Sequence, residues 1–428
     1  MARFLVATIP VVGHVTPMLP IVERLLSLGH EVWWYTGELF KTRIQAVGTH
    51  YVGMDQGLDF SIAENVPPAW TAEREPLKGL AQLKFDLKHY FIEAAIGNAK
   101  DLLKILEQFT ADVILADSFF MAAAWISEAK GIPWAQLGIS ALALPSQDTA
   151  PFGLGLQPDS SWLGRLRNRT LYGLLQNIVF RDVRTWINQA REEFALGPTN
   201  TGVFDLLSPY LYLANTVPGF EYPRSDLPPQ VHFIGPLLPS PTTEFMPPAW
   251  WADLGLDKPV VHVTQGTVAT NPQDLIIPTL RALEHEDVLV VATMGNKPVE
   301  SLGEFSIPDN ARVERFISHH NLLPHVDVMV TNGGYNGVQM ALANGIPTVV
   351  AGQSEDKPEV CARVAWCGAG INLKTKTPKP QQIRQAVKKL LVDESYRRNA
   401  RRLQIQIKDC KPAETAVALL EELVETKA

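Results

Sequence analysis

The chain has 428 residues, of which 46% are hydrophobic and 19% charged, a balance typical of a globular protein with two or three domains. Its formal net charge of −7 argues against a surface that binds nucleic acid. The cysteines Cys361, Cys367 and Cys410 show no metal-binding or redox spacing, and one of them must be unpaired, which is typical of a reducing compartment.

The first half of the chain alternates strand-like and helix-like segments. Its first apolar run is too short to span a membrane and lacks the form of a signal peptide, so we expect a cytoplasmic protein. Thr16 as N-cap and Pro17 at the first helical position predict a helix that ends near Leu28. We predict strands at Phe4–Thr8, Glu31–Tyr35 and Asp112–Ala116, with a helix at Leu39–Ala46. This alternation predicts a doubly wound parallel sheet.

Prolines cluster between Gly235 and Pro259, a composition that does not hold regular structure. We therefore predict an N-terminal domain at 1–235, a linker at 236–258, a second domain at 259–410 and a C-terminal segment at 411–428. After the linker the alternation restarts, with predicted strands at Val260–Thr264, Val288–Thr293, Val326–Val330 and Ile346–Val350 and predicted helices at Asn336–Ala343 and Glu414–Glu425.

The most specific pattern lies between Arg315 and Glu359, where a strand, a Gly-Gly turn and a helix follow one another. Backbone N–H groups and the helix dipole make such a turn an anion site, and the carboxyl end of a parallel strand is where open α/β sheets bind ligands. We expect the anion to be a nucleotide diphosphate, and the acidic loop beyond it indicates an attached hydroxyl-rich group. A dinucleotide site after the first strand is a weak alternative, because only Gly13 of the G-x-G-x-x-G pattern is present.

Two segments resemble the family 1 glycosyltransferases, which use nucleotide sugars: the opening PVVGHVTPMLPIVERLLSLGHEVWWYTG and the later RFISHHNLLPHVDVMVTNGGYNGVQMALANGIPTVVAGQSEDKPE. The similarity of pattern covers nearly the whole chain. It implies the GT-B fold, with two Rossmann-like domains facing across a cleft and a C-terminal helix that crosses back to the first domain. It also implies transfer of a sugar from a nucleotide diphosphate to an acceptor hydroxyl.

The resemblance implies that His14, in the G-H-x-x-P loop, removes the acceptor proton and that Asp117 orients it; both positions match. The chemistry agrees, because a base with a pKa near neutrality needs a carboxylate on its far ring nitrogen. Asp117 ends its predicted strand at the same edge as His14, whereas Asp112 begins it at the opposite edge. The alternatives are a capping loop histidine and, for Asp117, a helix N-cap.

On the donor side the resemblance selects one set of positions. They are Gly266, Thr267, Phe316, Ile317, His319, Asn332, Gly333, Gly334, Asn336, Gly337, Asp356 and Lys357. Phe316 is expected to stack on the nucleotide base, with packing in the core as the alternative. Asp356 is expected to accept hydrogen bonds from sugar hydroxyls. No metal and no cofactor besides the nucleotide sugar are expected, because clustered D-x-D is absent from the sequence and turn amides can stabilise a diphosphate.

Three positions depart from the family. Asn332 replaces a His that donates to phosphate, and Lys357 replaces a Gln, where it would bind a phosphate or an unusual sugar or pair with Glu355 or Glu359 on the surface. Met340 replaces a Glu that holds the ribose, and Gln339 points roughly 100° away from it. The resemblance favours a UDP-sugar as donor, but the loss of this carboxylate weakens the case for UDP and leaves a dTDP-sugar as the alternative.

Aromatic residues between Gln56 and Leu106, and from Pro145 to Phe194, predict a cleft for a hydrophobic small-molecule or lipid acceptor. The candidates are Phe60, Trp70, Phe85 and Phe119. The arginine-rich segment from Trp162 to Trp186 predicts a surface helix with a solvated basic face, with peripheral membrane binding as the less favoured alternative. The alternative functions are a nucleotide-sugar epimerase of the same fold and a catalytically silent protein that binds nucleotide sugar.

Overall fold

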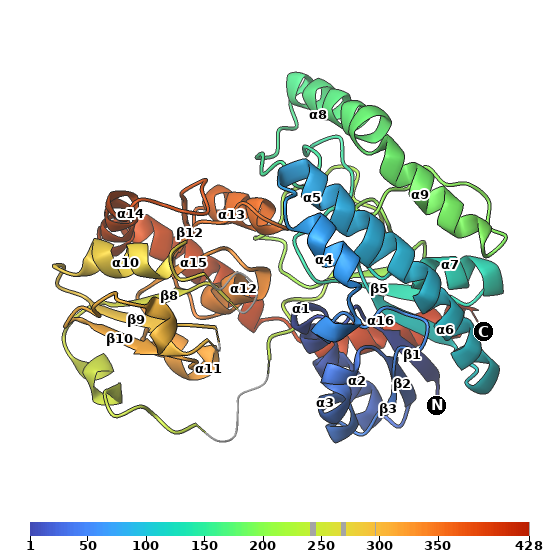
Figure 1. Ribbon diagram of the computed structural model, residues 1–428, viewed down its shortest axis with the longest axis horizontal. Helices are drawn as coiled ribbons and strands as arrows, with labels where there is room; N and C mark the ends of the chain where they lie inside the picture. Colours follow the sequence, from blue (N-terminus) through green and yellow to red (C-terminus); the bar gives the residue numbers. More distant parts are fainter. Residues whose placement is uncertain (240–244, 267–270, 296, 428) are drawn as a thin grey trace.

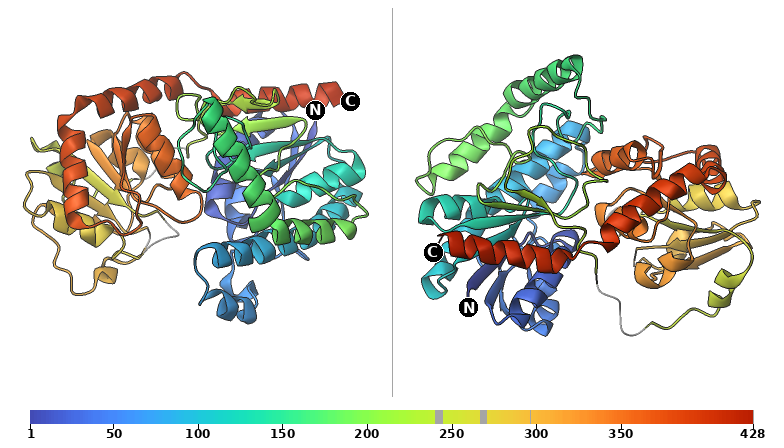
Figure 2. Two further views of the ribbon diagram at one scale, coloured as in Figure 1. Left: turned by 90° about the horizontal axis from the view of Figure 1, so that it is seen from above. Right: turned by 180° about the vertical axis from the view of Figure 1, so that it is seen from behind.

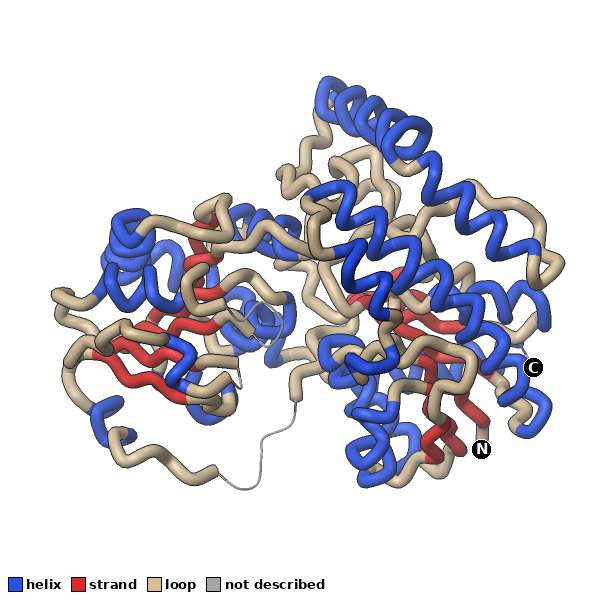
Figure 3. Tube along the Cα trace, in the orientation of Figure 1, coloured by secondary structure: helices blue, strands red, loops and turns tan. Residues whose placement is uncertain are grey.

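The protein, seen as a computed structural model, is described for residues 1–239, 245–266, 271–295 and 297–427 (Figure 1). These residues form two β-sheets whose strands are all parallel, with helices packed around each; Figure 3 shows the two groups of strands. The strand order is β3-β2-β1-β4-β5-β6-β7 in the first sheet and β10-β9-β8-β11-β12-β13 in the second. Each order reverses direction once, between β1 and β4 and between β8 and β11, and ligands bind at such switch points. The predicted α/β architecture is confirmed.

The first sheet and its helices come from the N-terminal part of the chain. The strands are β1 (Arg3–Ala7), β2 (Glu31–Tyr35), β3 (His50–Val52), β4 (Val113–Asp117), β5 (Trp134–Gly138), β6 (Leu211–Ala214) and β7 (Val231–Phe233). The helices are α1 (Val12–Val15), α2 (Leu19–Ser27), α3 (Lys41–Ala46), α4 (Pro68–Arg74), α5 (Gly79–Asp86), α6 (Ala94–Gln108), α7 (Met121–Lys130), α8 (Trp162–Leu174) and α9 (Arg181–Glu192). Strands β4 and β5 are buried along their whole length, as expected where helices cover both faces of a parallel sheet.

The helical run after β1 begins earlier than predicted. Helix α1 starts at Val12 and continues through a 3₁₀ turn (Thr16–Met18) into α2. Thr16 has φ −59° and ψ −43°, so it lies inside the helical run and is not its N-cap. Its hydroxyl accepts a hydrogen bond from Arg43 at 3.2 Å instead. His14 therefore lies in the first helical turn and not in a loop.

The second sheet is built from β8 (Val260–Thr264), β9 (Leu289–Thr293), β10 (Ala311–Glu314), β11 (Val328–Thr331), β12 (Thr348–Val350) and β13 (Gly370–Asn372). Its helices are α10 (Ile276–Leu283), α11 (His319–Leu322), α12 (Tyr335–Ala343), α13 (Lys357–Trp366), α14 (Pro380–Val392) and α15 (Glu394–Lys408). The predicted strands β8, β9, β11 and β12 contribute valine side chains to a buried core, a local pattern that the sequence displays, whereas β10 and β13 were not predicted.

The proline-rich stretch is not wholly irregular. Residues Trp251–Gly255 form a short 3₁₀ helix, and the Trp250 indole donates to Glu314 of β10 at 2.8 Å. The ring of Trp251 packs edge-on against Phe245, with centroids 4.9 Å apart. These aromatic contacts attach the end of the stretch to the second sheet.

The last helix, α16 (Pro412–Lys427), returns to the first sheet (Figure 2). It packs on α2, and its apolar residues Ala416, Val417 and Leu420 are buried in the same core as residues of β1. The His30 ring lies 3.0 Å from the Glu421 carboxylate at the far end of this contact.

Candidate active site

The two predicted catalytic residues meet at the carboxyl edge of the first sheet. Nδ1 of His14 lies 3.0 Å from Oδ1 of Asp117, an ion-pair distance, although the angle does not meet hydrogen-bond geometry. The Asp117 carboxylate is fully buried, and it accepts from the backbone N–H groups of Ile9 at 2.8 Å and Phe119 at 3.0 Å. The backbone therefore holds this carboxylate facing the ring. The His14 side chain remains 13% exposed, so a small molecule can reach it.

The N-cap alternative for Asp117 is wrong. Helix α7 begins at Met121 and its N-cap is Phe120, so the aspartate precedes the helix. Its bond to Phe119 N–H closes a turn between β4 and the helix. Asp112 lies at the other end of β4, where it accepts from the Arg3 backbone N–H at 2.7 Å.

On the facing domain, the predicted glycine turn connects β11 to α12. Gly333 has φ +81°, and a Cβ atom there would lie 2.5 Å from Sγ of Cys361. Gly334 is the N-cap of α12, and within the described residues no side chain caps the first turn, which contains Asn336 and Gly337. The Gly333 and Gly334 amides donate to the side chains of Thr331 and Asn332, so it is the amide groups of the first turn of α12 that are placed to bind an anion.

Two other donor positions lie beside the turn. The Asn332 side chain is buried; its amide donates to the Gln265 carbonyl and its oxygen accepts from Gly334 N–H. The Asn332 amide was predicted to be able to replace the family His as a donor to phosphate. In the structure this amide is already hydrogen-bonded within the protein. Gly266 has φ +69°, and no atom of the described residues lies within 4 Å of where a Cβ would stand, whereas Thr267 lies outside the described residues.

Phe316 follows the end of β10 and its side chain is 57% exposed, so the alternative that it packs in the core is wrong. Ile317 is buried next to it. His319 contacts a second histidine, with its Nε2 3.4 Å from Nε2 of His262. Burial lowers the pKa of His262 to about 3 and that of His319 to about 4, so both rings are neutral at neutral pH.

The acidic loop touches the other domain. Asp356 accepts a hydrogen bond from the Ser140 hydroxyl at 2.6 Å, and burial raises the pKa of Asp356, although the bond from Ser140 opposes this. Lys357 is not on the surface; it is buried and pairs with Glu355. Gln339 does not face a ribose, because its amide donates to Thr216 in the first domain at 2.8 Å. Met340 packs against an apolar cluster of the second domain.

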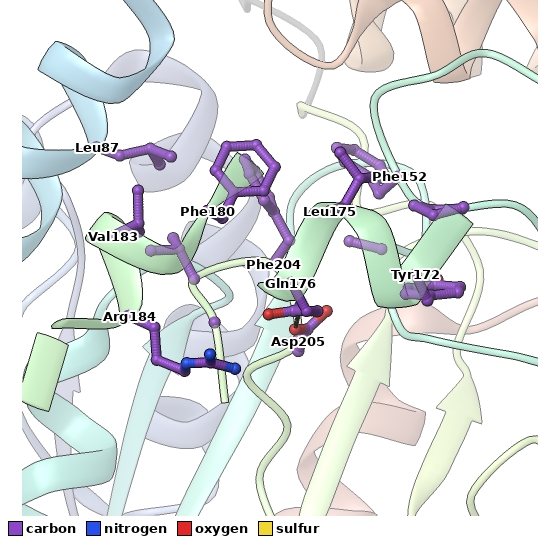
Figure 4. Close-up of a pocket in the computed structure, with 14 residues that line it drawn as sticks. Leu87, Phe152, Tyr172, Leu175, Gln176, Phe180, Val183, Arg184, Phe204 and Asp205 are labelled. Atoms are coloured by element: carbon purple, nitrogen blue, oxygen red, sulfur yellow. Dashed lines mark hydrogen bonds between the residues drawn. The ribbon is translucent and has the colours of Figure 1, made fainter. Parts of the chain in front are cut away.

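An aromatic pocket lies in the first domain beside α8 and α9 (Figure 4). Its lining includes Leu87, Phe152, Tyr172, Leu175, Gln176, Phe180, Arg184, Phe204 and Asp205. Phe119 lies between this pocket and His14: its ring centroid is 6.1 Å from that of Phe204 and 6.2 Å from that of His14. Gln176 donates to Asp205, and burial raises the pKa of this carboxyl.

The other predicted acceptor residues do not line this pocket. Phe60 and Trp70 pack edge-on against Tyr90, with centroids 5.5 and 5.8 Å apart. Trp70 and Phe85 also flank His89, at 4.5 and 4.3 Å. These residues form a separate aromatic cluster on the turn at Phe60, on α4, on α5 and on the π-helical segment Leu87–Glu93. The predicted acceptor segment Pro145–Phe194 agrees better with the structure than the four named residues do, because it supplies most of the pocket lining.

Comparisons with known proteins agree with this geometry. Residues 277–423 match the erythromycin biosynthesis protein CIII-like C-terminal domain. The 4'-demethylrebeccamycin synthase of Lentzea aerocolonigenes is 46% identical over 427 residues, which cover 99% of this chain and 100% of that protein. UDP-glycosyltransferase 2 of Phaeomoniella chlamydospora is 35% identical, with 98% of this chain and 95% of that protein covered. The chain belongs to the family 1 glycosyltransferases.

Solved glycosyltransferases share the fold. The calicheamicin glycosyltransferase CalG4 superposes with a TM-score of 0.73 at 21% identity, covering 99% of this chain and 98% of that one. The glycotransferase of kitacinnamycin has a TM-score of 0.74 at the same identity and coverage. The GT-B prediction is thus confirmed. Membership of the family also supports a glycosyltransferase over the epimerase and the silent binding protein.

The sequence did not indicate which residues join the two halves of this glycosyltransferase. Glu359 on α13 accepts from the backbone N–H groups of Gly153 at 2.9 Å and Gly155 at 2.8 Å, across the domains. One turn later, Arg363 donates to Glu359 at 2.8 Å and to Glu221 at 2.9 Å. The i, i+4 spacing of Glu359 and Arg363 was a visible signal of pairing, but Glu221 is 142 residues away in sequence.

The described residues contain no group of three or more His, Cys, Asp or Glu side chains arranged to hold a metal ion. Nor does any helix among residues 1–427, apart from the undescribed gaps, have the length and apolar character needed to cross a membrane.

Proposed function

We propose that this glycosyltransferase moves a sugar from a nucleotide diphosphate to a hydroxyl group of a hydrophobic small-molecule or lipid acceptor, with inversion at the anomeric carbon. A UDP-sugar is the favoured donor, since the related enzymes of Phaeomoniella chlamydospora and Beauveria bassiana are named UDP-glycosyltransferase 2 and UDP-glucosyltransferase 1. A dTDP-sugar is the alternative, because Met340 stands where the family has a ribose-binding Glu.

The contact between His14 and Asp117 carries the proposal. With Asp117 at Nδ1, the free Nε2 of the ring accepts the proton of the acceptor hydroxyl, and the carboxylate stabilises the imidazolium that forms. The acceptor oxygen then bonds to the anomeric carbon while the bond from that carbon to the diphosphate breaks. A single displacement of this kind inverts the configuration.

The leaving diphosphate would be held by the amide groups of the first turn of α12, which the Gly333-Gly334 turn leaves open to it. Amide N–H groups and the positive end of a helix dipole stabilise the developing charge. Exposed Phe316 would stack on the base, and Asp356 would exchange its bond with Ser140 for bonds to sugar hydroxyls. In this scheme the protein needs neither a metal ion nor a further cofactor.

The acceptor would enter the pocket of Figure 4, which must widen to hold it. The cavity volume is about 40 Å³, whereas sites for small molecules usually enclose roughly 300–1,000 Å³. Two π-helical segments, Leu87–Glu93 and Leu175–Val179, contribute lining residues. Such segments are often found at functional sites, and their looser hydrogen bonding permits local adjustment.

The proposal is tested with purified protein, UDP-glucose or dTDP-glucose, and a panel of aromatic and aliphatic alcohols, with products detected by mass spectrometry. His14→Ala should lower the transfer rate by about 10²–10⁴-fold, the usual contribution of a general base. Stabilisation of the protein by UDP or dTDP in a thermal-shift assay should remain, because the donor turn lies on the other domain. His285→Ala, at an exposed histidine of the second domain, is the matched control. Equal loss of transfer and nucleotide binding in His14→Ala would contradict the assignment.

A further inference from the structure

The outer face of α8 and of the π-helical segment that follows it carries a group of large apolar side chains that are exposed to solvent. Trp162, Leu163, Leu166, Leu174 and Ile178 have side chains that are between 49% and 73% exposed. Most of them recur at a spacing of four or eight residues, so they share one side of the helix. We call these five residues the α8 face. The sequence-based expectation of a solvated basic face is therefore incomplete: Arg169 and Arg181 are exposed, but large apolar side chains share the solvated side with them.

The arrangement of this helix is inverted relative to an ordinary surface helix, whose apolar stripe faces the core. The fully buried positions on α8 are Gly164 and Asn168, a small and a polar residue. Asn168 donates to the Gln147 carbonyl at 2.9 Å, and the Ser161 hydroxyl caps the helix by accepting from Gly164 N–H at 3.1 Å. Polar bonds thus anchor the inner side, while the large apolar side chains face outwards. Contiguous exposed apolar surface of this kind marks an interaction site.

The charges around the α8 face indicate the kind of partner. Residues 160–181 contain Arg165, Arg167, Arg169 and Arg181 and no Asp or Glu, in a chain whose net charge is −7. At roughly 100° per residue, Arg165 and Arg169 lie along one edge of the face and Arg167 along the other. Asp148 pairs with Arg165 and Asp182 with Lys84, so the charge at the two edges comes from Arg167 and Arg169, which form no ion pair among the described residues; Asp159 accepts from the Ser161 hydroxyl.

An apolar face with arginines along both edges fits an anionic lipid surface. The aliphatic and indole groups enter the boundary of the acyl chains, and the guanidinium groups stay level with the phosphates. Trp162, the most exposed of the five, is the residue type enriched at this depth of a bilayer. A protein partner with an acidic rim would have to supply an equally long apolar surface, and nothing in the charge pattern favours that over lipid.

We propose that the α8 face binds the surface of a membrane that contains anionic lipid, with α8 lying in the plane of the interface. The helix occupies the outer edge of the first domain in Figure 1, where the rest of the molecule does not obstruct such contact. Its inner side, with Tyr172 and Leu175, lines the aromatic pocket. If that pocket is the acceptor site, which rests on the proposed function, a lipophilic acceptor could pass from the bilayer beside the helix that encloses it.

The test is co-sedimentation of the full chain with vesicles of phosphatidylcholine alone and of equal parts phosphatidylcholine and phosphatidylglycerol. Wild-type protein should bind the mixed vesicles, bind phosphatidylcholine at least tenfold less, and dissociate as salt is raised. The double variant Leu166→Glu/Ile178→Glu should lose at least tenfold in binding. The control Val392→Glu/Ile405→Glu changes two equally exposed apolar residues on other helices and the net charge by the same amount, so it should bind nearly as well.

Absence of binding to mixed vesicles, or equal loss in both double variants, would overturn the proposal. The wild type could instead self-associate without binding vesicles. If only Leu166→Glu/Ile178→Glu abolished that self-association, the result would overturn the proposal in favour of a second copy of this chain as the partner. All four substitutions replace exposed side chains, and equal melting temperatures verify the fold. Transfer to a water-soluble alcohol should be unchanged in both variants, which separates this test from that of the proposed function.

Discussion

Arg363 on α13 and Glu221 in the first domain form a buried ion pair across the two halves of the protein, with Nε 2.9 Å from Oε2. Both side chains are 1% exposed, and the Arg363 guanidinium also lies 4.2 Å from the centre of the Tyr222 ring. The same helix begins at Lys357, directly after Asp356. This pair therefore couples the proposed sugar-binding loop to the opposite domain.

Removing the cation of this pair should destabilise the protein strongly. Arg363→Met keeps most of the volume but leaves buried Glu359 without its ion-pair partner and Glu221 with only Arg224 at 3.6 Å, and breaking a buried pair typically costs about 3–5 kcal/mol. We expect a clear fall in melting temperature, partly recovered by adding Glu221→Gln. Lys41→Met, which breaks an exposed pair with Glu38, should cost less than about 1 kcal/mol. Similar melting temperatures for the two single variants would contradict the role of the network.

Phe316→Ala should weaken nucleotide binding without affecting stability. The ring is exposed and supports no core contact, so the melting temperature of the free protein should hardly change. Stacking of an aromatic ring on a base contributes about 1–3 kcal/mol, so calorimetric titration with UDP should show affinity lower by roughly 5- to 150-fold. Ile405→Ala removes an equally exposed apolar side chain elsewhere and should leave the affinity unchanged. Unchanged affinity in Phe316→Ala would mean that the nucleotide base binds at another surface of the protein.

Gly333→Ala should impair both folding and donor binding for two separable reasons. Its φ of +81° costs an L-residue about 1–2 kcal/mol, and the new methyl group would clash with Cys361 Sγ. The double variant Gly333→Ala/Cys361→Ala should remove the clash and recover only part of the melting temperature. Gly266→Ala is the control for backbone strain alone, since φ is also positive there and the space is open. Full recovery in the double variant would mean that the backbone conformation contributes nothing.

The buried histidine pair should make the second domain sensitive to acid. An unfolded histidine titrates near pH 6.5, whereas burial lowers the pKa of His262 to about 3 and of His319 to about 4 in the folded protein. The unfolded state therefore binds more protons, so stability is complete above pH 6.5 and falls as the pH drops towards 4 and 3. His319→Gln should reduce this fall, as measured by melting temperatures between pH 7 and pH 4. A steeper fall in the variant would show that the sign is wrong.

The sequence by itself determined the parallel sheets and the meeting of His14 with Asp117. Buried strands of branched aliphatic residues are local patterns, and in a parallel sheet all strands end at one edge, so residues that follow β1 and β4 must lie close together. The glycine turn at Gly333 could also be predicted from the sequence, because the positive φ that favours glycine is a property of the local backbone.

Only the tertiary structure decided which side chains the two domains share and which way each helix faces. Glu221 and Arg363 pair across 142 positions, a contact that no local pattern encodes. Phe60, Trp70 and Phe85 are as aromatic as Phe180 and Phe204, yet packing assigns them to a different cluster. The apolar residues of α8 face solvent because the polar bonds of Asn168 and Ser161 fix the inner side of that helix. Hydrophobicity drives burial without direction, so it is the directional hydrogen bonds and the shape of the neighbouring domain that select the final arrangement.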